Sequence, residues 1–342
     1  MLTAPRRFAR LLMNKNSRIF VAGHRRLVGS AIVRRLHALG FDNLALRTHS
    51  ELDLADPTAT RGFFETEQPE FVIVAAAKVG GIHANSTLPG TFIHTNLAIQ
   101  TNVLHEAWRA GVKRLLFLGS SCIYPRECPQ PIHEDYLLTG QLEPTNSAYA
   151  VAKIAGIEMC RSYNRQYGTH FLAAMPTNMY GPGDNFDLET SHVLPALLRK
   201  TLEATLRDED EVVVWGTGKP RREFLHSDDL ADGCVMLLSL DTATFDAFLS
   251  SHYYPLINIG YGEDITIAEL AQLIARKVEF AGRLRFDSSR PDGTMRKLMD
   301  SSRMRSLGWK PKIDLEQGIE QMIGRLRSQS SVAPREKRTV SQ

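Results

Sequence analysis

The chain has 342 residues, 43% hydrophobic and 23% charged, a composition typical of a globular protein with a substantial core. Its net charge of +3 resides at the two ends, because residues 1–18 and 325–342 together carry +9 and the remainder carries −6. This distribution argues against a nucleic-acid-binding face on the folded part. No apolar run approaches the ~20 residues that a membrane-spanning helix needs.

The chain ends and the cysteines indicate where the protein works. Residues 1–17 are basic and free of acids, and we expect a disordered extension there, with an import sequence as the alternative and Met13 as a second possible start. Residues 328–342 are expected to form a disordered tail. The four cysteines contain no CxxC pair, which favours free thiols and a cytoplasmic location.

Short apolar runs alternate with amphipathic segments in the first half of the chain. They predict a strand at Ile19–Ala22, a helix from Leu27 that Gly40 ends, and further strands at Leu44–Leu46, Phe71–Ala77 and Leu115–Leu118. This pattern is typical of an α/β protein with a Rossmann-like, doubly wound parallel sheet. Ligands bind such sheets at the carboxyl ends of the strands, so we expect the functional residues there.

The second half has a more mixed pattern. It predicts helices at Leu194–Leu206, Asp228–Leu238 and Ile267–Val278, and a strand at Val212–Trp215. We therefore expect a dinucleotide-binding domain over residues 18–185, to which later segments return, and a smaller mixed α/β substrate domain over residues 186–327.

The turn between the first strand and the first helix resembles a dinucleotide-binding loop. Gly23 and Gly29 bracket a segment in which backbone amides and the helix dipole can hold a pyrophosphate. Arg26 replaces the middle glycine, and without its context the pattern fits an ordinary strand-to-helix turn equally well. The candidate loop residues are Gly23, His24, Arg25, Arg26, Leu27, Val28 and Gly29.

The end of the second strand predicts the cofactor. An NAD enzyme places Asp or Glu about 20 residues after the loop, whereas this strand ends in Arg47, Thr48 and His49. Neutral or cationic groups suit the 2′-phosphate of NADP(H), so Arg25 and His49 are candidate phosphate partners. The alternative is that both are ordinary solvated surface residues.

A third pattern predicts the catalytic residues. Tyr149 and Lys153 have the YxxxK spacing, which places them one turn apart on one face of a helix. We expect the ammonium to lower the pKa of the phenol, so that it can exchange a proton with a substrate oxygen. Ser120, which follows a buried strand, can supply a hydroxyl to the same oxygen. Together these three residues resemble the catalytic set of the short-chain dehydrogenases.

Longer motifs resemble one family within that group, the GDP-L-fucose synthases. The likeness runs from about Arg18 to Leu326 and rests on four segments: Ala75-Ala76-Ala77-Lys78-Val79-Gly80-Gly81-Ile82, Leu118 through Tyr124-Pro125, Glu143-Pro144-Thr145-Asn146, and Pro176-Thr177-Asn178-Met179-Tyr180-Gly181-Pro182.

The resemblance implies a bifunctional enzyme that converts GDP-4-keto-6-deoxy-D-mannose to GDP-L-fucose. Epimerisation at sugar carbons 3 and 5 precedes hydride delivery from NADPH to carbon 4. Each epimerisation needs a base and an acid, and the family positions fall on Cys122 and His192. We expect a positive site near Cys122 to favour its thiolate.

The resemblance also implies the remaining site residues and the assembly. Cofactor contacts fall on Leu118, Gly119, Ser121, Lys153, Pro176, Thr177, Asn178, Met179 and His192, with Asn178 at the nicotinamide pocket. Substrate contacts fall on Lys200, Trp215, Arg222, Asp292 and Lys297. No metal site, nucleic acid or membrane is expected. The family further implies a homodimer that forms through two helices at the sheet edge, one of which bears Tyr149.

Two other functions fit parts of the sequence. A related nucleotide-sugar epimerase or dehydratase would share Ser120, Tyr149 and Lys153, but dehydratases carry an acid and a glutamate beside the serine, where this chain has Ser121 and Cys122. A catalytically impaired nucleotide-sugar-binding protein is the second alternative, and Arg26 in the cofactor loop is the reason for it.

Overall fold

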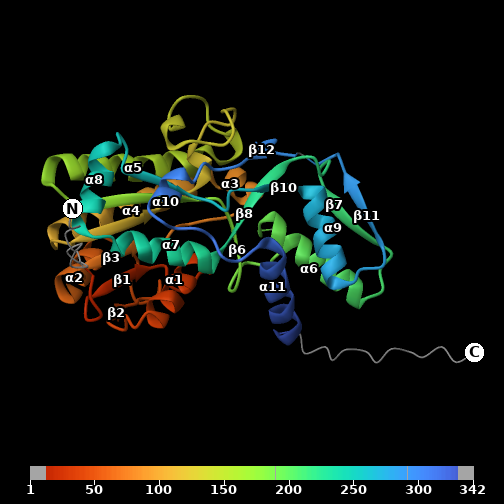
Figure 1. Ribbon diagram of the computed structural model, residues 1–342, viewed down its shortest axis with the longest axis horizontal. Coiled ribbons are helices and arrows are strands. Elements are labelled where there is room, and N and C mark those ends of the chain that lie inside the picture. Colours follow the sequence, from red (N-terminus) through yellow and green to blue (C-terminus); the bar gives the residue numbers. More distant parts are fainter. Residues whose placement is uncertain (1–12, 189, 291, 330–342) are drawn as a thin grey trace, which may run out of the picture.

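A six-stranded parallel sheet forms the centre of the larger part of the molecule (Figure 1). The computed structural model describes residues 13–188, 190–290 and 292–329. The strand order is β2-β1-β3-β4-β5-β9, with bounds β1 Ile19–Ala22, β2 Leu44–Ala45, β3 Phe71–Val74, β4 Arg114–Leu118, β5 Phe171–Pro176 and β9 Leu256–Ile259. The predicted doubly wound fold is confirmed.

Helices cover both faces of this sheet because successive side chains of each strand point to opposite sides. Ile19 and Val21 pack in one core with helices α1 and α7, whereas Phe20 and Ala22 pack in another with α2, α4 and α5. The helices of this part are α1 Leu27–Ala38, α2 Pro57–Glu67, α3 Ile82–Thr87, α4 Pro89–Arg109, α5 Ser147–Tyr167, α7 Ser227–Ser239, α8 Thr242–Ser251 and α10 Ser302–Ser306.

A smaller part with its own core lies to the right in Figure 1. Its helices are α6 Val193–Leu206, α9 Ile267–Val278 and α11 Leu315–Gln329, and its strands are β6 Asn178–Tyr180, β7 Glu211–Trp215, β8 Arg221–His226, β10 Asp264–Thr266, β11 Arg283–Asp287 and β12 Arg296–Lys297. Strand β8 pairs with β6, β10 and β12, and β7 pairs with β11. Short 3₁₀ helices occur at η1 Ser121–Ile123, η2 Glu134–Tyr136 and η3 Pro144–Asn146.

The predicted elements agree with the structure over most of their length. Helix α9 has the predicted bounds, and α1 ends just before Gly40, whose φ is +76°. The strand predicted at Phe71–Ala77 ends earlier, at Val74, because the following segment leaves the sheet. Asn96 of α4 holds that segment through both backbone groups of Lys78, at 2.9 and 3.0 Å. The domain boundaries at residues 185/186 and 327/328 stay predictions.

Both expected disordered ends need correction. Met13 is only 2% exposed in the core beside β1, and Lys15 donates a hydrogen bond to the carbonyl of Leu39, so residues 13–17 pack on the fold. Residues 328 and 329 belong to α11, whose amphipathic pattern carries the helix two residues further than expected. Residues 1–12 and 330–342 lie outside the described part.

Within the described residues, no single helix is long and apolar enough to cross a membrane. The pair α7 and α8 meets the criteria of length and composition only when counted together, and its two helices meet at 101°.

Helix α5 approaches the sheet closely at Gly156. A methyl group there would overlap the ring of Phe117 on β4. Gln100 of α4 also donates a hydrogen bond of 2.6 Å to the carbonyl of Ala152 on α5. These contacts fix α5, and with it Tyr149 and Lys153, against the end of β4.

We expect Gly156→Ala to lower the free energy of unfolding by about 1–3 kcal/mol, because an added methyl overpacks the contact with Phe117. Gly62→Ala is the matched control, since Gly62 lies inside α2 with open space around its Cα, and it should gain up to about 1 kcal/mol from better helix propensity. Urea unfolding of both variants measures the difference, and equal effects would contradict the close α5–β4 contact.

Candidate active site

The proposed catalytic residues gather where β4 ends beside α5. Ser120 follows β4 and accepts a hydrogen bond from the amide of Cys122 at 3.5 Å. Lys153 is buried and donates to the carbonyl of Leu118 at 2.8 Å, with its Nζ 5.8 Å from the centre of the Tyr149 ring. Cys122 interacts electrostatically with both Tyr149 and Lys153. A serine, a phenol, an ammonium and a thiol thus share one largely dry site.

Burial dominates the proton affinities in this cluster. It raises the pKa of Tyr149 well above its usual value, and the nearby Cys122 raises it further. It lowers the pKa of Lys153 to about 8. The expected lowering of the Tyr149 pKa by Lys153 is therefore wrong for this state of the protein, because the ammonium donates to the Leu118 carbonyl and loses part of its own charge to desolvation.

The expectation for Cys122 also needs correction. Burial raises the pKa of this thiol, although Lys297, the Ser120 hydroxyl and Lys153 all act in the opposite direction. The positive surroundings that favour a thiolate are present, but desolvation outweighs them. Lys297 is the largest of these opposing influences, so it lies close to Cys122 although the sequence placed it only with the phosphates.

His192 stands apart from that cluster. It precedes the first turn of α6, has an exposed side chain and has a pKa lowered by desolvation, so it is largely neutral near pH 7. The two residues before it lie near Gly81, in the loop after β3. Among the described residues no hydrogen bond or ion pair joins His192 to the four clustered residues, and its role as the acid stays a prediction.

The loop after β1 has the compact geometry of a dinucleotide turn. Gly23 has φ +83°, and a Cβ there would lie 2.7 Å from the amide nitrogen of Ala76; a Cβ at Gly29 would overlap the carbonyl of Gly23. Helix α1 has no side-chain cap and no acid in its first turn, so its amides are open to an anion. Arg26 has φ −87°, a conformation that any residue adopts, and its side chain is exposed. The replacement of glycine by Arg26 therefore strains no backbone.

The end of β2 presents cationic and neutral groups. Arg25 and His49 are both exposed, as a contact with a 2′-phosphate requires. Arg47 is taken up by an ion pair with Glu67. Glu51 is the one feature here that the sequence prediction missed: it lies near Arg25 and accepts hydrogen bonds from the amide and hydroxyl of Thr48, at 2.7 and 2.8 Å.

The other expected cofactor contacts cluster at the carboxyl ends of β4 and β5. A Cβ at Gly119 would overlap the Met175 side chain, so only glycine fits there. Asn178 and Thr177 both donate to the carbonyl of Glu223, at 2.8 and 3.3 Å, which attaches the start of β6 to β8. The expected residues of this group are Leu118, Gly119, Ser121, Pro176, Thr177, Asn178 and Met179, and all of them lie on or directly after these strands.

The expected substrate residues lie in the smaller part. Lys297 on β12 is in register with Arg222 on β8, which places two cations side by side near Cys122. Burial lowers the pKa of Arg222, and Asp292 opposes that shift. Asp292 is itself engaged, because its two oxygens accept from the amide and the hydroxyl of Thr217 at 2.7 Å each. A role in holding that loop is therefore evident, whereas substrate contact stays a prediction.

Lys200 and Trp215 lie together, with the lysine Nζ 4.6 Å from the centre of the indole ring. Arg290 approaches the same ring at 5.0 Å. The sequence analysis did not single out Arg290. Its position two residues before Asp292 was the only signal, and that signal says nothing about a contact with Trp215, 75 positions away in the chain.

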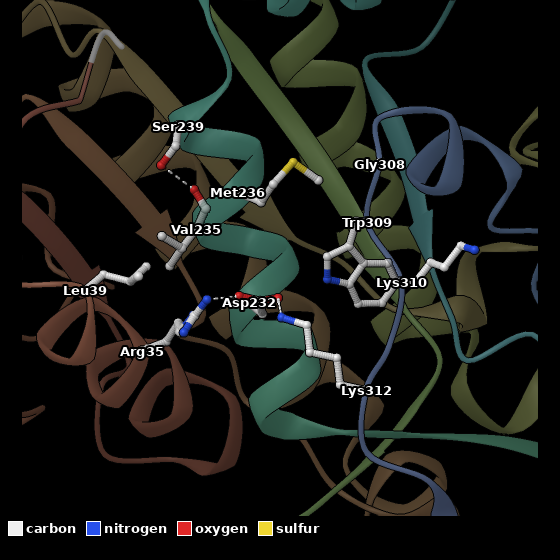
Figure 2. A pocket seen from close by; sticks show the side chains of 10 residues that line it. All are labelled: Arg35, Leu39, Asp232, Val235, Met236, Ser239, Gly308, Trp309, Lys310 and Lys312. Carbon is white, nitrogen blue, oxygen red and sulfur yellow. Dashed lines mark hydrogen bonds and ion pairs between the residues drawn. The ribbon is translucent and has the colours of Figure 1, made fainter.

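The largest cavity found among the described residues, about 350 Å³, lies away from these residues, between α1, α7 and the segment before α11 (Figure 2). Asp232 pairs there with Arg35 and with Lys312, the latter at 2.9 Å, while Trp309 closes the wall. These pairs join α1, α7 and the segment before α11, and none of the expected site residues lines the cavity. We found no group of three or more His, Cys, Asp or Glu side chains in the described part that could hold a metal ion.

The glycine turn before α1, the parallel sheet and the buried Ser120, Tyr149 and Lys153 define a Rossmann-fold enzyme of the dehydrogenase type. The chain belongs to the NAD dependent epimerase/dehydratase family, whose model matches residues 19–247.

Three similar proteins narrow the comparison. The chain is 58% identical over 310 residues to "Putative GDP-L-fucose synthase 2" of Arabidopsis thaliana, covering 91% of this chain and 92% of that protein. It resembles the structure of a GDP-6-OMe-4-keto-L-xylo-heptose reductase from C. jejuni, with TM-score 0.87, 41% identity and coverage of 93% and 99%. A GDP-L-fucose synthetase from Naegleria fowleri bound to NADP matches with TM-score 0.81, 27% identity and coverage of 94% and 97%.

Asp184 is a titratable group beside the site that the sequence analysis did not consider. It follows β6 in a loop whose Gly183 lies against Ser30 in the first turn of α1. One carboxylate oxygen accepts from the amide of Asn185 at 2.8 Å, and the other is buried without a partner among the described residues. Burial raises the pKa of Asp184 from its ordinary 3.8 to about 7.

Because the folded-state pKa lies above the unfolded one, the folded state binds more protons between about pH 4 and 7, and Asp184 reduces stability as the pH rises through that window. We expect Asp184→Asn to stabilise the protein more at pH 8 than at pH 5. Asp208→Asn, at an exposed position, is the control. Urea midpoints at the two pH values measure the effect, and a pH-independent difference would contradict the buried carboxylate.

Proposed function

We propose that the chain catalyses the NADPH-dependent 3,5-epimerisation and 4-reduction of GDP-4-keto-6-deoxy-D-mannose to GDP-L-fucose. The observation that carries this proposal is the buried cluster of Ser120, Cys122, Tyr149 and Lys153. A carbonyl reductase needs only the serine, tyrosine and lysine, and the thiol beside them adds a group that can move a proton at carbon. The names of the relatives support the same activity.

The residues of this chain suit NADP(H). Gly23 and Gly29 allow the backbone to close tightly, the uncapped start of α1 offers amides to the diphosphate, and Arg25 and His49 are exposed where a 2′-phosphate needs a cation. When bound, NADPH supplies the hydride for carbon 4. Asn178, held by the Glu223 carbonyl, faces the nicotinamide in this proposal.

The reduction requires a proton for the carbonyl oxygen. Tyr149 keeps its proton at neutral pH because its pKa is raised, and it can therefore donate to the alkoxide that forms when hydride reaches carbon 4. Ser120 donates a hydrogen bond to the same oxygen. Lys153, with a pKa of about 8, can return a proton to Tyr149 without leaving its position by Leu118.

Epimerisation requires removal of a proton next to the keto group and its return on the opposite face. In our proposal the Cys122 thiolate accepts the proton, and Lys297 and Lys153 stabilise the thiolate in that step. His192 returns a proton from the other side. Its solvent-exposed position at the start of α6 allows it to regain a proton from water.

The decisive experiment measures NADPH consumption and product with GDP-4-keto-6-deoxymannose. The unaltered chain should form GDP-L-fucose, and Tyr149→Phe should reduce turnover at least about 100-fold because the proton donor is lost. Cys122→Ser should instead abolish exchange of the carbon 3 and carbon 5 protons with deuterated water. Separate losses in the two variants distinguish reduction from epimerisation.

The alternatives have their own outcomes in the same assay. Retained cofactor without net NADPH consumption identifies a simple epimerase, and turnover only in Arg26→Gly identifies a synthase impaired by its cofactor loop. Binding of GDP-sugar without turnover in either protein identifies a binding protein and contradicts our proposal. The unstrained backbone and exposed side chain of Arg26 favour activity in the unaltered chain.

We further propose a cytoplasmic homodimer that forms through α4 and α5. The two helices pack side by side, and apolar side chains remain on their outer surface, with Val151 of α5 44% exposed. Four cysteines without a disulfide support a reducing compartment.

We expect Val151→Lys to convert the dimer to a monomer, because two copies would place like charges in an apolar interface. Light scattering of the purified protein measures the mass. Leu206→Lys, on the exposed end of α6 and of similar exposure, is the control and should leave the mass unchanged. A monomeric wild type would refute the assembly.

A further inference from the structure

Two cations pack against one exposed indole in the smaller part of the protein. Lys200 of α6 lies 4.6 Å from the centre of the Trp215 ring, and Arg290 lies 5.0 Å from it. Both distances lie within the range in which a cation is attracted to an aromatic ring. Trp215 ends β7 with 55% of its surface exposed, so the group faces solvent rather than the core.

Neither cation has an ion pair with a carboxylate among the described residues. Asp292 is occupied by Thr217, and the nearest acid to Arg290, Asp287, accepts from the amide and hydroxyl of Ser289 at 3.1 and 2.6 Å. Arg290 and burial both act to lower the pKa of Lys200, which shows that the two charges repel each other. An anion between them would relieve that repulsion.

The pair is not an isolated feature. Arg222, called a substrate residue above, lies near Asp292 and Gly293, in the same segment as Arg290. Lys297 is in register with Arg222 on the next strand. Four cations thus face one short stretch of surface that leads toward Cys122, and the single acid within it is engaged by a backbone amide and a hydroxyl.

We propose that Arg290 is a substrate-binding residue which, together with Lys200, binds the diphosphate of the nucleotide sugar, and that Trp215 holds these two cations in place instead of stacking on the base. The proposal rests on the proposed function and specifies how its nucleotide end is recognised.

The chemistry of the three side chains supports this assignment. A guanidinium presents paired N–H groups that match two phosphate oxygens, whereas an ammonium acts as a point charge, so the two together suit an extended dianion. A flexible Arg or Lys side chain loses conformational entropy on binding, and prior packing on an aromatic ring reduces that loss. An indole whose surroundings are already occupied by cations offers less area to a purine.

The test compares binding of GDP, GMP and guanosine to the full-length protein by calorimetry. Arg290→Gln should weaken GDP about tenfold or more, because it removes a charge-assisted hydrogen bond, and should leave guanosine unchanged. Arg285→Gln is the matched control, since Arg285 is exposed on the neighbouring strand and already pairs with Glu211 at 2.6 Å. It should bind GDP as the wild type does.

Trp215 variants test the second half of the proposal. Trp215→Leu should weaken GDP as Arg290→Gln does and leave guanosine binding intact, and Trp215→Phe should recover part of the loss because it retains an aromatic face. If Trp215→Leu weakens guanosine as strongly as GDP, the indole stacks on the base and the proposal is wrong. Unchanged GDP binding in Arg290→Gln overturns it as well.

Turnover separates this inference from the proposed function. With an active wild type, Arg290→Gln should raise KM for the GDP-sugar with little change in kcat, because the contact holds the diphosphate in ground state and transition state alike. A wild type that binds GDP but forms no product contradicts the proposed function and leaves the binding comparison intact. A wild type that does not bind GDP refutes both.

Discussion

The packing of α5 against the end of β4 is the contact on which the site depends. The missing side chain at Gly156 admits the Phe117 ring, and Lys153 reaches over that ring to the carbonyl of Leu118. A larger residue at Gly156 would push the helix away from the strand. Lys153 would then lose its acceptor, and Tyr149 would no longer share a dry site with Cys122. The chemistry of the cluster thus follows from a packing distance between a helix and a strand.

Desolvation sets the protonation of the site more strongly than individual charges do. Tyr149 and Cys122 hold their protons and Lys153 has a lowered pKa, each mainly because burial disfavours the charged form. Sequence spacing indicates which charges are neighbours but not how much water surrounds them. The expected lowering of the Tyr149 and Cys122 pKa values failed for that reason, whereas the grouping of the residues was predicted correctly.

Local patterns predicted the elements well where the signal was itself local. Helix α9 begins at the capping box of Thr266 and Glu269 and carries a regular apolar face, so its bounds could be read from the sequence. The contact of Arg290 with Trp215 and the hold of Asn96 on Lys78 could not, because each joins segments brought together only by the fold. The end of β3 was misplaced because Ala75, Ala76 and Ala77 are as apolar as a strand although they leave the sheet.

Strand β9 has a consequence for how the chain is made. It lies at the edge of the parallel sheet beside β5, yet it is separated from β5 by most of the smaller part, including α6, α7 and α8. During synthesis the nucleotide-binding sheet therefore stays open at β5 until Ile259 has left the ribosome. The apolar edge of β5 is exposed to other nascent chains throughout that interval, and a protein shortened before β9 would keep that edge permanently unpaired.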